Sequence, residues 1–354
     1  MATKTRQSNV ELLRLVAMFL ILMTHANFFS LGRPKAAAFE AEPVWIGLRF
    51  AAQSFTYIGV NLFILISGYF AIKPRFRGVA AFLFQVLFFS LAVVGVLACV
   101  DAVTSGTAVG WRQVGNACMV LTRYNWFIAA YLLLMLFAPA LNAFCQNAPR
   151  RHLLLMIVLF LAASTYLGWA KHYSKEFNDG YSFVSLMWLY LAGRYLRLYG
   201  GRWVRRSWKT DAVHFLIYVV VNTAIALWRM KNPYRMSLFA LNNPIQLYGT
   251  ICFFLVFIKL QFQSPWVNRV AKGTFGIFLL QMHPLMIPYF RRWIQGMHAQ
   301  WTHAGFALGA VALVLAFCAA GLLADGLRRW AWERAEVPLC RAYDVVKSRW
   351  TGWL

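Results

Sequence analysis

Charged residues are scarce in this chain of 354 residues, and acidic residues are the scarcest of them. Asp, Glu, Lys and Arg make up 13% of the sequence, against about 25% in an average soluble domain. Apolar residues reach 61%, and the mean hydropathy is +0.56. This deficit of charge excludes an ordinary soluble domain. Together with repeated apolar runs of about 20 residues, it predicts an all-α polytopic membrane protein.

The shortage of acids leaves the chain strongly basic. It has 11 Asp and Glu against 35 Lys and Arg, a net charge of +24. That charge could suit nucleic acid, but no basic block is long enough to form a nucleic-acid arm. We therefore expect no nucleic-acid partner and assign the charge to loops that face anionic membrane lipid. The six Cys residues include no C-x-x-C pair, so we expect neither a redox motif nor a bound metal.

About ten apolar stretches are long enough to be membrane spans. An even number of spans places both termini on one side of the membrane. Lys and Arg favour one set of alternating loops by roughly two to one, and such loops face the cytoplasm. We therefore predict that both termini are cytoplasmic. The predicted spans cover residues 12–30, 45–71, 79–100, 125–146, 153–170, 182–199, 211–229, 239–261, 273–290 and 303–325.

The loops between these stretches are short, and none has the composition of a soluble domain or a linker. We therefore expect a single transmembrane domain over residues 1–325, followed by a basic cytoplasmic tail over residues 326–354. The tail could form an amphipathic helix on the inner leaflet, or it could simply continue the last span.

The first span carries titratable groups, which are rare inside membranes because they are costly there. Glu11 and Arg14 stand at the i,i+3 spacing of a helix ion pair. Arg14 and His25 are separated by about three helical turns, so they share one stripe of the helix with about 16 Å of rise between them. These three residues are the first candidates for a functional site.

Polar residues also interrupt the second span, GVNLFILISGYF at 59–70. Asn61, Ser67 and Tyr69 could line a pocket, or the small residues could simply let helices approach closely. Arg75 and Arg77 follow in KPRFR. They could bind phosphates, or they could be no more than the positive charge of an inner loop.

Two later spans hold further polar candidates. Asn125 and Trp126 open the fourth span, where they could be interface anchors or could line a polar pocket. Gln281 and His283 lie in the ninth span, which Pro284 and Pro288 interrupt. Broken helices are tolerated at membrane depth where they line a cavity. The ninth span is therefore a second candidate for a polar site.

The order of these motifs resembles the acyltransferase-3 family of bacterial integral-membrane O-acyltransferases. The family pattern of an acid, an Arg, ten residues and a His matches Glu11, Arg14 and His25. GVNLFILISGYF is similar to its second-helix motif. The segments NWFIAAYLLLMLFAPALN (125–142), LAGRYLRLYG (191–200) and TFGIFLLQMHP (274–284) resemble later ones. The chain departs from the pattern at Phe278, where the family has Tyr, and at Gln281, where it has His.

The resemblance implies a multi-pass enzyme of the bacterial cytoplasmic (inner) membrane. Its reaction would be transfer of an acyl group, acetyl from acetyl-CoA, to a hydroxyl of an extracytoplasmic glycan, an exopolysaccharide unit or a lipid-linked saccharide. His is suited to act as the base near neutral pH, and His25 is the candidate. An acyl-histidine intermediate is the open alternative. Because acetyl-CoA is cytoplasmic, the chemistry needs a cavity that connects the inner surface to His25.

The remaining candidate residues are assigned to a donor path or to a substrate pocket by their expected depth in the membrane. Glu11 and Arg14 lie too far from His25 to act on its imidazole, so they serve structure or the donor path. The donor-path set is Glu11, Arg14, Arg75 and Arg77. The substrate-pocket set is Asn61, Ser67, Tyr69, Asn125, Trp126, Gln281 and His283. A transporter or flippase of a glycan or small polar solute is the alternative function, and a structural or sensory membrane protein is a third. The sequence leaves the oligomeric state open.

Overall fold

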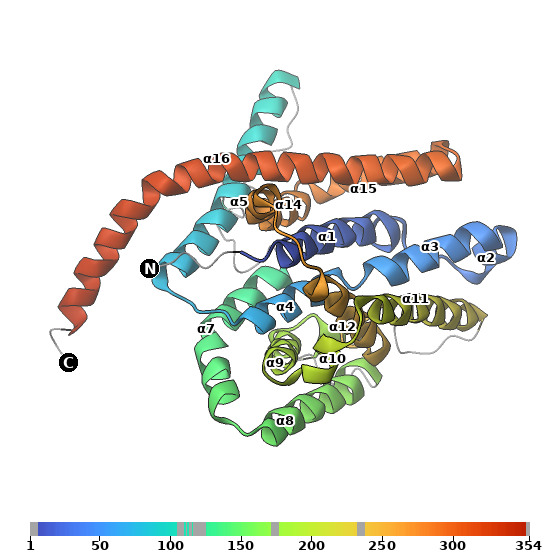
Figure 1. Cartoon of the computed structure of the whole chain (residues 1–354). Helices are drawn as coiled ribbons and strands as arrows, with labels where there is room; N and C mark the ends of the chain where they lie inside the picture. The colour runs from blue at the N-terminus through green and yellow to red at the C-terminus, as the bar shows by residue number, and fades with distance from the viewer. Residues whose placement is uncertain are drawn as a thin grey trace.

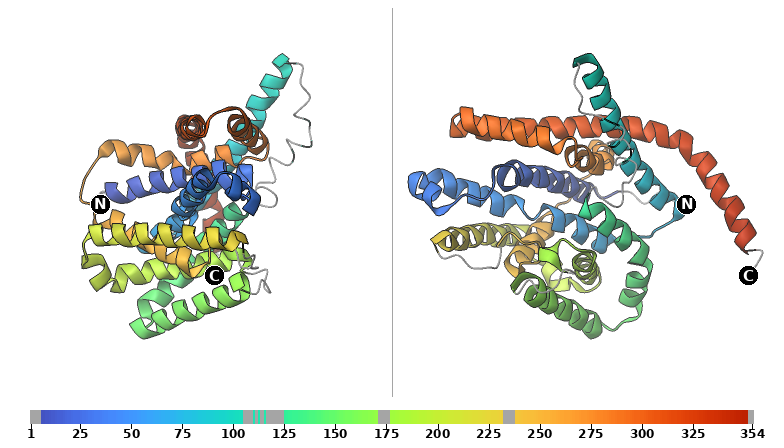
Figure 2. Two further views of the ribbon diagram at one scale, coloured as in Figure 1. Left: turned by 90° about the vertical axis from the view of Figure 1, so that its right-hand side faces the viewer. Right: turned by 180° about the vertical axis from the view of Figure 1, so that it is seen from behind.

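The computed structural model describes residues 6–104, 125–170, 177–231 and 238–351, together with positions 110, 112 and 115. Its described elements are all helices, with no strand among them, so the predicted all-α class is confirmed. Figure 1 shows a bundle whose long α16 (His303–Thr351) runs along one edge. Helix α8 (Arg150–Ala163) lies at the opposite edge, and the turned views agree (Figure 2).

Within the described residues, seven helices are long and apolar enough to cross a membrane. This confirms a polytopic membrane protein, while the count of ten and the cytoplasmic placement of the termini stay predictions. The predicted spans at 182–199 and 239–261 are the shorter helices α9 (Phe183–Tyr199) and α12 (Pro244–Lys259). The seven are Ser8–Phe29, Pro43–Phe70, Phe76–Val100, Trp126–Asn147, Arg150–Ala170, Trp208–Met230 and His303–Arg341.

The predicted span at 273–290 is a broken segment, as its prolines predict. Helix α14 (Thr274–Gln281) ends before a turn, and α15 (Ile287–Gln300) begins after it. Pro284 lies in the turn and Pro288 in the first turn of α15, where a missing N–H costs nothing. The break therefore leaves Gln281 at the end of a buried helix.

The helix ends gather into two groups. At one end, the Ser8 hydroxyl of α1 (Ser8–Thr24) donates to Gln263 Oε1 at 3.1 Å. At the other, Gln295 Nε2 of α15 donates to the carbonyl of Ser30 at 2.9 Å. We name these the Arg14 end and the His25 end, after the two basic residues of the first span. The positive-inside rule predicts that the Arg14 end faces the cytoplasm.

The glycine of the second-span motif serves packing. Helix α4 (Gly59–Phe70) crosses α9 so closely that a Cβ at Gly68 would overlap the carbonyl oxygen of Tyr190. A Cβ at Gly193 would in turn meet the carbonyl oxygen of Leu65. Small residues allow such close approach of membrane helices. The packing interpretation of Gly68 is therefore confirmed.

We expect Gly68→Ala to lower the free energy of unfolding by about 1–3 kcal/mol, because the added methyl forces two helix backbones apart. Thermal unfolding of the purified protein in detergent measures this. The matched control is Gly95→Ala in α5 (Phe76–Thr104), where a Cβ would meet nothing within 4 Å. An unchanged unfolding temperature for Gly68→Ala would contradict the close crossing.

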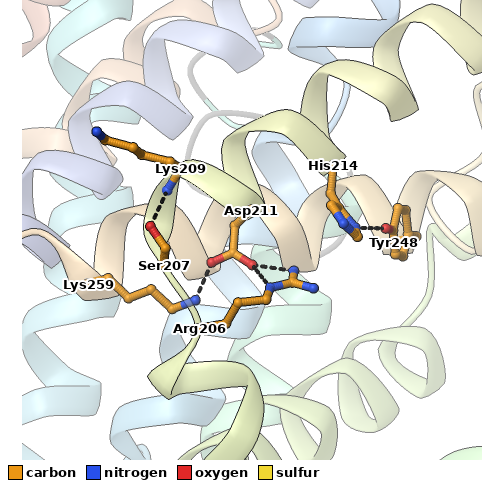
Figure 3. Close-up of polar contacts among 7 residues, drawn as sticks. All are labelled: Arg206, Ser207, Lys209, Asp211, His214, Tyr248 and Lys259. Carbon is orange, nitrogen blue, oxygen red and sulfur yellow. Dashed lines mark hydrogen bonds and ion pairs between the residues drawn. The ribbon is translucent and has the colours of Figure 1, made fainter.

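Two buried acids tie helices together near the Arg14 end. Asp211 of α11 (Trp208–Lys231) lies between Arg206, whose Nε donates to it at 3.1 Å, and Lys259 of α12 (Figure 3). Asp325 of α16 accepts from Gln85 of α5 at 2.9 Å and pairs with two arginines of its own helix. A buried charge is stable only when it is paired in this way.

The predicted tail continues the last span. Helix α16 runs without interruption through residue 326 and includes Pro338. Beyond that point it contacts the start of α5. Glu336 pairs with Arg77 at 2.5 Å, and the ring of Tyr343 stacks on Phe76 at 3.9 Å between centroids. The tail is thus helical and continuous with the last span, while its position relative to the membrane stays a prediction.

Candidate functional site

A cavity of about 550 Å³ opens beside α1 at the His25 end. The first span supplies one wall of the cavity, which consists of Met18, Ile21 and Thr24 of α1 and of His25, Phe28 and Phe29 directly after it. These residues recur at helical spacing, so a single stripe of the first span faces the cavity. The cavity has the size of a small-molecule site, and it has a mostly apolar lining with few polar groups, as is usual for such sites.

The helix changes its winding at His25. Residues His25–Phe29 form a π-helical segment, and Asn27 within it has non-helical angles (φ −94°, ψ −105°). The Ser30 hydroxyl satisfies the His25 carbonyl at 2.6 Å. Single π turns occur often at functional sites because they redirect side chains. Nothing in the spacing of the sequence predicts this segment.

Gln281 fixes the orientation of the His25 ring. Its Oε1 lies 2.8 Å from His25 Nδ1, and its side chain is completely buried at the end of α14. An amide oxygen can only accept, so with the amide placed in this way Nδ1 is the donor, and in the neutral imidazole the lone pair lies on Nε2. Nε2 forms no hydrogen bond to a described residue. The contact with Gln281 thus orients the His25 ring so that, in the neutral imidazole, Nε2 is the basic nitrogen.

His283, the second polar candidate of the broken ninth span, contacts α5 and not His25. His283 is buried, with Nε2 3.3 Å from the carbonyl oxygen of Ser90 in α5, while its Nδ1 accepts from the N–H of Leu285. These contacts hold the turn between α14 and α15 against α5. The family pattern has its late His at position 281, so Gln281, and not His283, occupies the place next to the first-helix His.

Several polar groups of the cavity were absent from the predicted set. Gln53 lines it with a buried Oε1 that has no hydrogen-bond partner. Thr24 and Thr56 bond each other at 3.0 Å, and the Tyr57 and Tyr181 hydroxyls lie 2.5 Å apart. Gln53 stands out as a polar residue in an apolar stretch, which is a signal that the sequence offers. These side chains can bind the hydroxyls of a polar ligand.

The predicted pocket residues divide into two groups. Asn125 and Trp126 line the cavity, and Tyr181 packs edge-on against Trp126 at 5.0 Å. Asn61, Ser67 and Tyr69 do not line it. Asn61 donates to the Leu241 carbonyl at 2.8 Å and Ser67 to the Phe63 carbonyl at 2.8 Å, while the Tyr69 hydroxyl accepts from Arg197 at 3.2 Å.

The predicted donor-path residues lie at the Arg14 end, apart from the cavity. Arg14 pairs with Glu11 at 2.5 Å, which confirms the predicted i,i+3 pair. The cavity lining on α1 stops at Met18, about one turn above Arg14. Arg75 is exposed, and Arg77 is occupied by Glu336.

The described residues contain no group of three or more His, Cys, Asp or Glu side chains placed to hold a metal ion. The reactive group that the cavity offers is the oriented imidazole of His25. Such a group can take a proton from a hydroxyl or attack a carbonyl carbon directly.

Comparison with protein families matches residues 7–323 to the family model described as "Acyltransferase domain", of the acyltransferase-3 family. The match covers α1, the residues that line the cavity and the first part of α16, up to residue 323. No curated protein and no solved structure matches the chain.

Proposed function

Because the chain belongs to the acyltransferase-3 family and is a multi-pass membrane protein, we propose that it is a membrane O-acyltransferase that uses acetyl-CoA. The acceptor is a hydroxyl of a glycan, either an exopolysaccharide unit or a lipid-linked saccharide, on the extracytoplasmic side. The membrane is the cytoplasmic membrane of a bacterium. Family membership supports acyl transfer, while the donor, the acceptor and the location are our inference.

The observation that carries the proposal is the contact between His25 Nδ1 and Gln281 Oε1. It leaves Nε2 as a base within a cavity large enough for two reacting groups. The acceptor hydroxyl gives its proton to Nε2 while its oxygen attacks the thioester carbonyl. The new C–O bond forms and the C–S bond breaks. The departing CoA thiolate then takes the proton from the imidazolium, which restores the neutral base.

The same tautomer permits a two-step route. Nε2 would attack the thioester to form an acyl-histidine, and the acceptor hydroxyl would then attack that intermediate. Rapid quenching in the absence of acceptor, followed by mass spectrometry of the peptide containing His25, separates the two routes. A transient acyl adduct on His25 indicates the covalent one.

The donor reaches His25 from the Arg14 end in this scheme. We expect Arg14, Arg75 and Arg77 to bind the phosphates of CoA, because the guanidinium group of Arg forms bidentate hydrogen bonds with phosphate. Met18, Phe63 and Phe275 are the lining residues nearest that end, judged from the direction of their helices. Passage of the thioester requires these three side chains to move apart.

We expect the purified protein in nanodiscs to release free CoA from acetyl-CoA only when a hydroxyl acceptor is added, and to leave an O-acetyl ester on that acceptor. Thiol detection and mass spectrometry measure the two products. The control is the same protein with acetyl-CoA alone. A transporter or flippase would move the saccharide chemically unchanged, so transport without ester formation would contradict the proposal and favour that alternative.

A further inference from the structure

The two ends of the bundle differ in whether their basic side chains are paired with acids. At the Arg14 end, each of three buried acids is matched with two basic side chains. Glu11 pairs with Arg6 and Arg14, Asp211 with Arg206 and Lys259, and Asp325 with Arg328 and Arg329. This pairing is what burial of charge requires.

At the His25 end, three arginines around the cavity lack such an acid. We name Arg33, Arg49 and Arg291 the arginine rim; none of them forms an ion pair with a described residue. Arg49 is 8% exposed, and its guanidinium donates only to neutral oxygens, those of Asn27 at 3.1 Å and Gly32 at 3.3 Å. The rim is therefore a concentration of uncompensated positive charge.

None of the acids that the structure describes at this end forms an ion pair with the arginine rim. Glu42 lies 3.4 Å from His303, and Glu40 is exposed on α2 (Ala36–Ala41). Asp179 lies near the two cavity tyrosines. Burial of the Tyr181 ring, together with the negative charge of Asp179, raises the pKa of Tyr181. Burial of the Arg33 guanidinium, together with the nearby charge of Arg229, lowers the pKa of Arg33.

The rim stands close to the proposed base. Arg33 lines the cavity, and its guanidinium lies 5.8 Å from the ring of Phe50. Arg291 lies 4.2 Å above the ring of Phe29, which is itself 4.9 Å from the His25 ring. A single aromatic ring thus separates the Arg291 guanidinium from the imidazole. The Nε of Arg291 is buried without a hydrogen-bond partner.

Arg49 has a different part in the rim, because it shapes the turn that carries Arg33. Its bonds to Asn27 and Gly32 hold the chain where α1 ends. Gly32 has a φ of 76°, a conformation that glycine adopts without strain. Arg49 therefore positions Arg33, while Arg33 and Arg291 are the arginines available to a ligand.

Arg33 is exposed where it lines the cavity, and Arg291 is half-buried. An unpaired cation that is partly removed from water, as Arg291 is, is costly, and a ligand anion would offset the cost. Guanidinium groups match the two oxygens of a carboxylate or phosphate. We propose that the arginine rim binds a carboxylate or phosphate of the acceptor, so that the enzyme acylates a hydroxyl near a negatively charged group of an acidic or phosphorylated saccharide. This inference rests on the proposed function, because it names the acceptor of the same site.

The test is equilibrium binding to the full chain in nanodiscs of phosphatidylcholine, without acetyl-CoA. The probes are a trisaccharide containing glucuronic acid, the same trisaccharide with its carboxyl reduced to the alcohol, and the neutral trisaccharide with a phosphate at its reducing end. We expect either anionic probe to bind about tenfold or more tightly than the neutral one, the contribution expected of a charged hydrogen bond. Arg33→Gln and Arg291→Gln should each remove about that factor.

Two exposed neighbours supply matched controls of equal charge change, Lys35→Gln beside Arg33 and Arg292→Gln beside Arg291. Both should bind like the wild type. Equal or undetectable binding of charged and neutral probes by the wild type would overturn the inference. So would an equal loss in the control variants.

A lipid phosphate is the other source of the same chemistry, and a separate arm tests it. In nanodiscs containing phosphatidylglycerol, lipid bound to the wild type and to the Arg33 and Arg291 variants is measured. If these variants lose bound phosphatidylglycerol but bind the saccharide probes as the wild type does, the inference is overturned. The two proposals fail separately. If the protein prefers anionic probes but transfers no acyl group, only the proposed function is contradicted. If it acylates neutral and acidic saccharides equally well, only the proposed role of the arginine rim is contradicted.

Discussion

Replacing His25 with Ala or Asn is expected to lower acyl transfer by about 10²–10⁴-fold, the contribution of a positioned general base. Nε2 is the one ring nitrogen of His25 without a hydrogen bond to a described residue, and the side chain lines the cavity. Neither Ala nor Asn can take the hydroxyl proton near neutral pH. The rate of CoA release with a saturating acceptor measures the loss.

The fold should survive this change, because His25 lies at the end of α1 beside a cavity and not in a packed layer. Unfolding temperature and acetyl-CoA binding should therefore stay near the wild-type values. The matched control is His152→Asn, which removes an exposed imidazole at the start of α8. Transfer at the wild-type rate by a folded His25→Ala protein would refute the assignment of the base.

The second large effect is expected from Gln281→Leu, which keeps the size of the side chain and removes its amide. Without the acceptor at 2.8 Å, the ring is free to rotate and to carry its proton on Nε2. A fall of about 10²-fold in kcat is expected, since the base is then present mostly in the wrong tautomer or orientation. KM for acetyl-CoA should stay unchanged, because Gln281 does not line the cavity.

Gln281→Glu separates positioning from packing. A carboxylate oxygen can accept from Nδ1 as the amide oxygen does, so this variant should recover most of the activity that Gln281→Leu loses. Gln281→Leu and Gln281→Glu alter the same buried side chain. If Gln281 served only the packing of the helices, both variants would be inactive. Equal activity in Gln281→Leu and the wild type, or no recovery in Gln281→Glu, would count against the positioning role.

Polar residues in an apolar helix were the weakest part of the sequence-based prediction. Asn61 and Ser67 looked like Asn125 and Trp126 as pocket candidates, yet only the latter two line the cavity. Asn61 instead donates to the Leu241 carbonyl, which is far away in the sequence. A buried amide or hydroxyl must find a partner, but the sequence of one helix does not reveal whether that partner is a neighbouring backbone or a ligand.

Local patterns nevertheless determined a good deal. Hydropathy fixed the membrane class, since a run of about 20 apolar residues is a property of one segment. The spacing of Glu11 and Arg14 predicted their ion pair. The spacing of Arg14 and His25 predicted that both lie on one face of the helix, at two different depths in the membrane. The prolines after Gln281 predicted a break, because proline removes a backbone donor wherever it stands.

Only the tertiary structure decided what surrounds His25. Its partner Gln281 is 256 residues away, and the arginine rim assembles Arg33, Arg49 and Arg291 from three separate segments. Such contacts depend on the tilt and depth at which helices pack, and those are set by many side chains at once. The sequence by itself thus determined a membrane acyltransferase candidate with a buried histidine. The packing decided which nitrogen of that histidine is free and which charges face it.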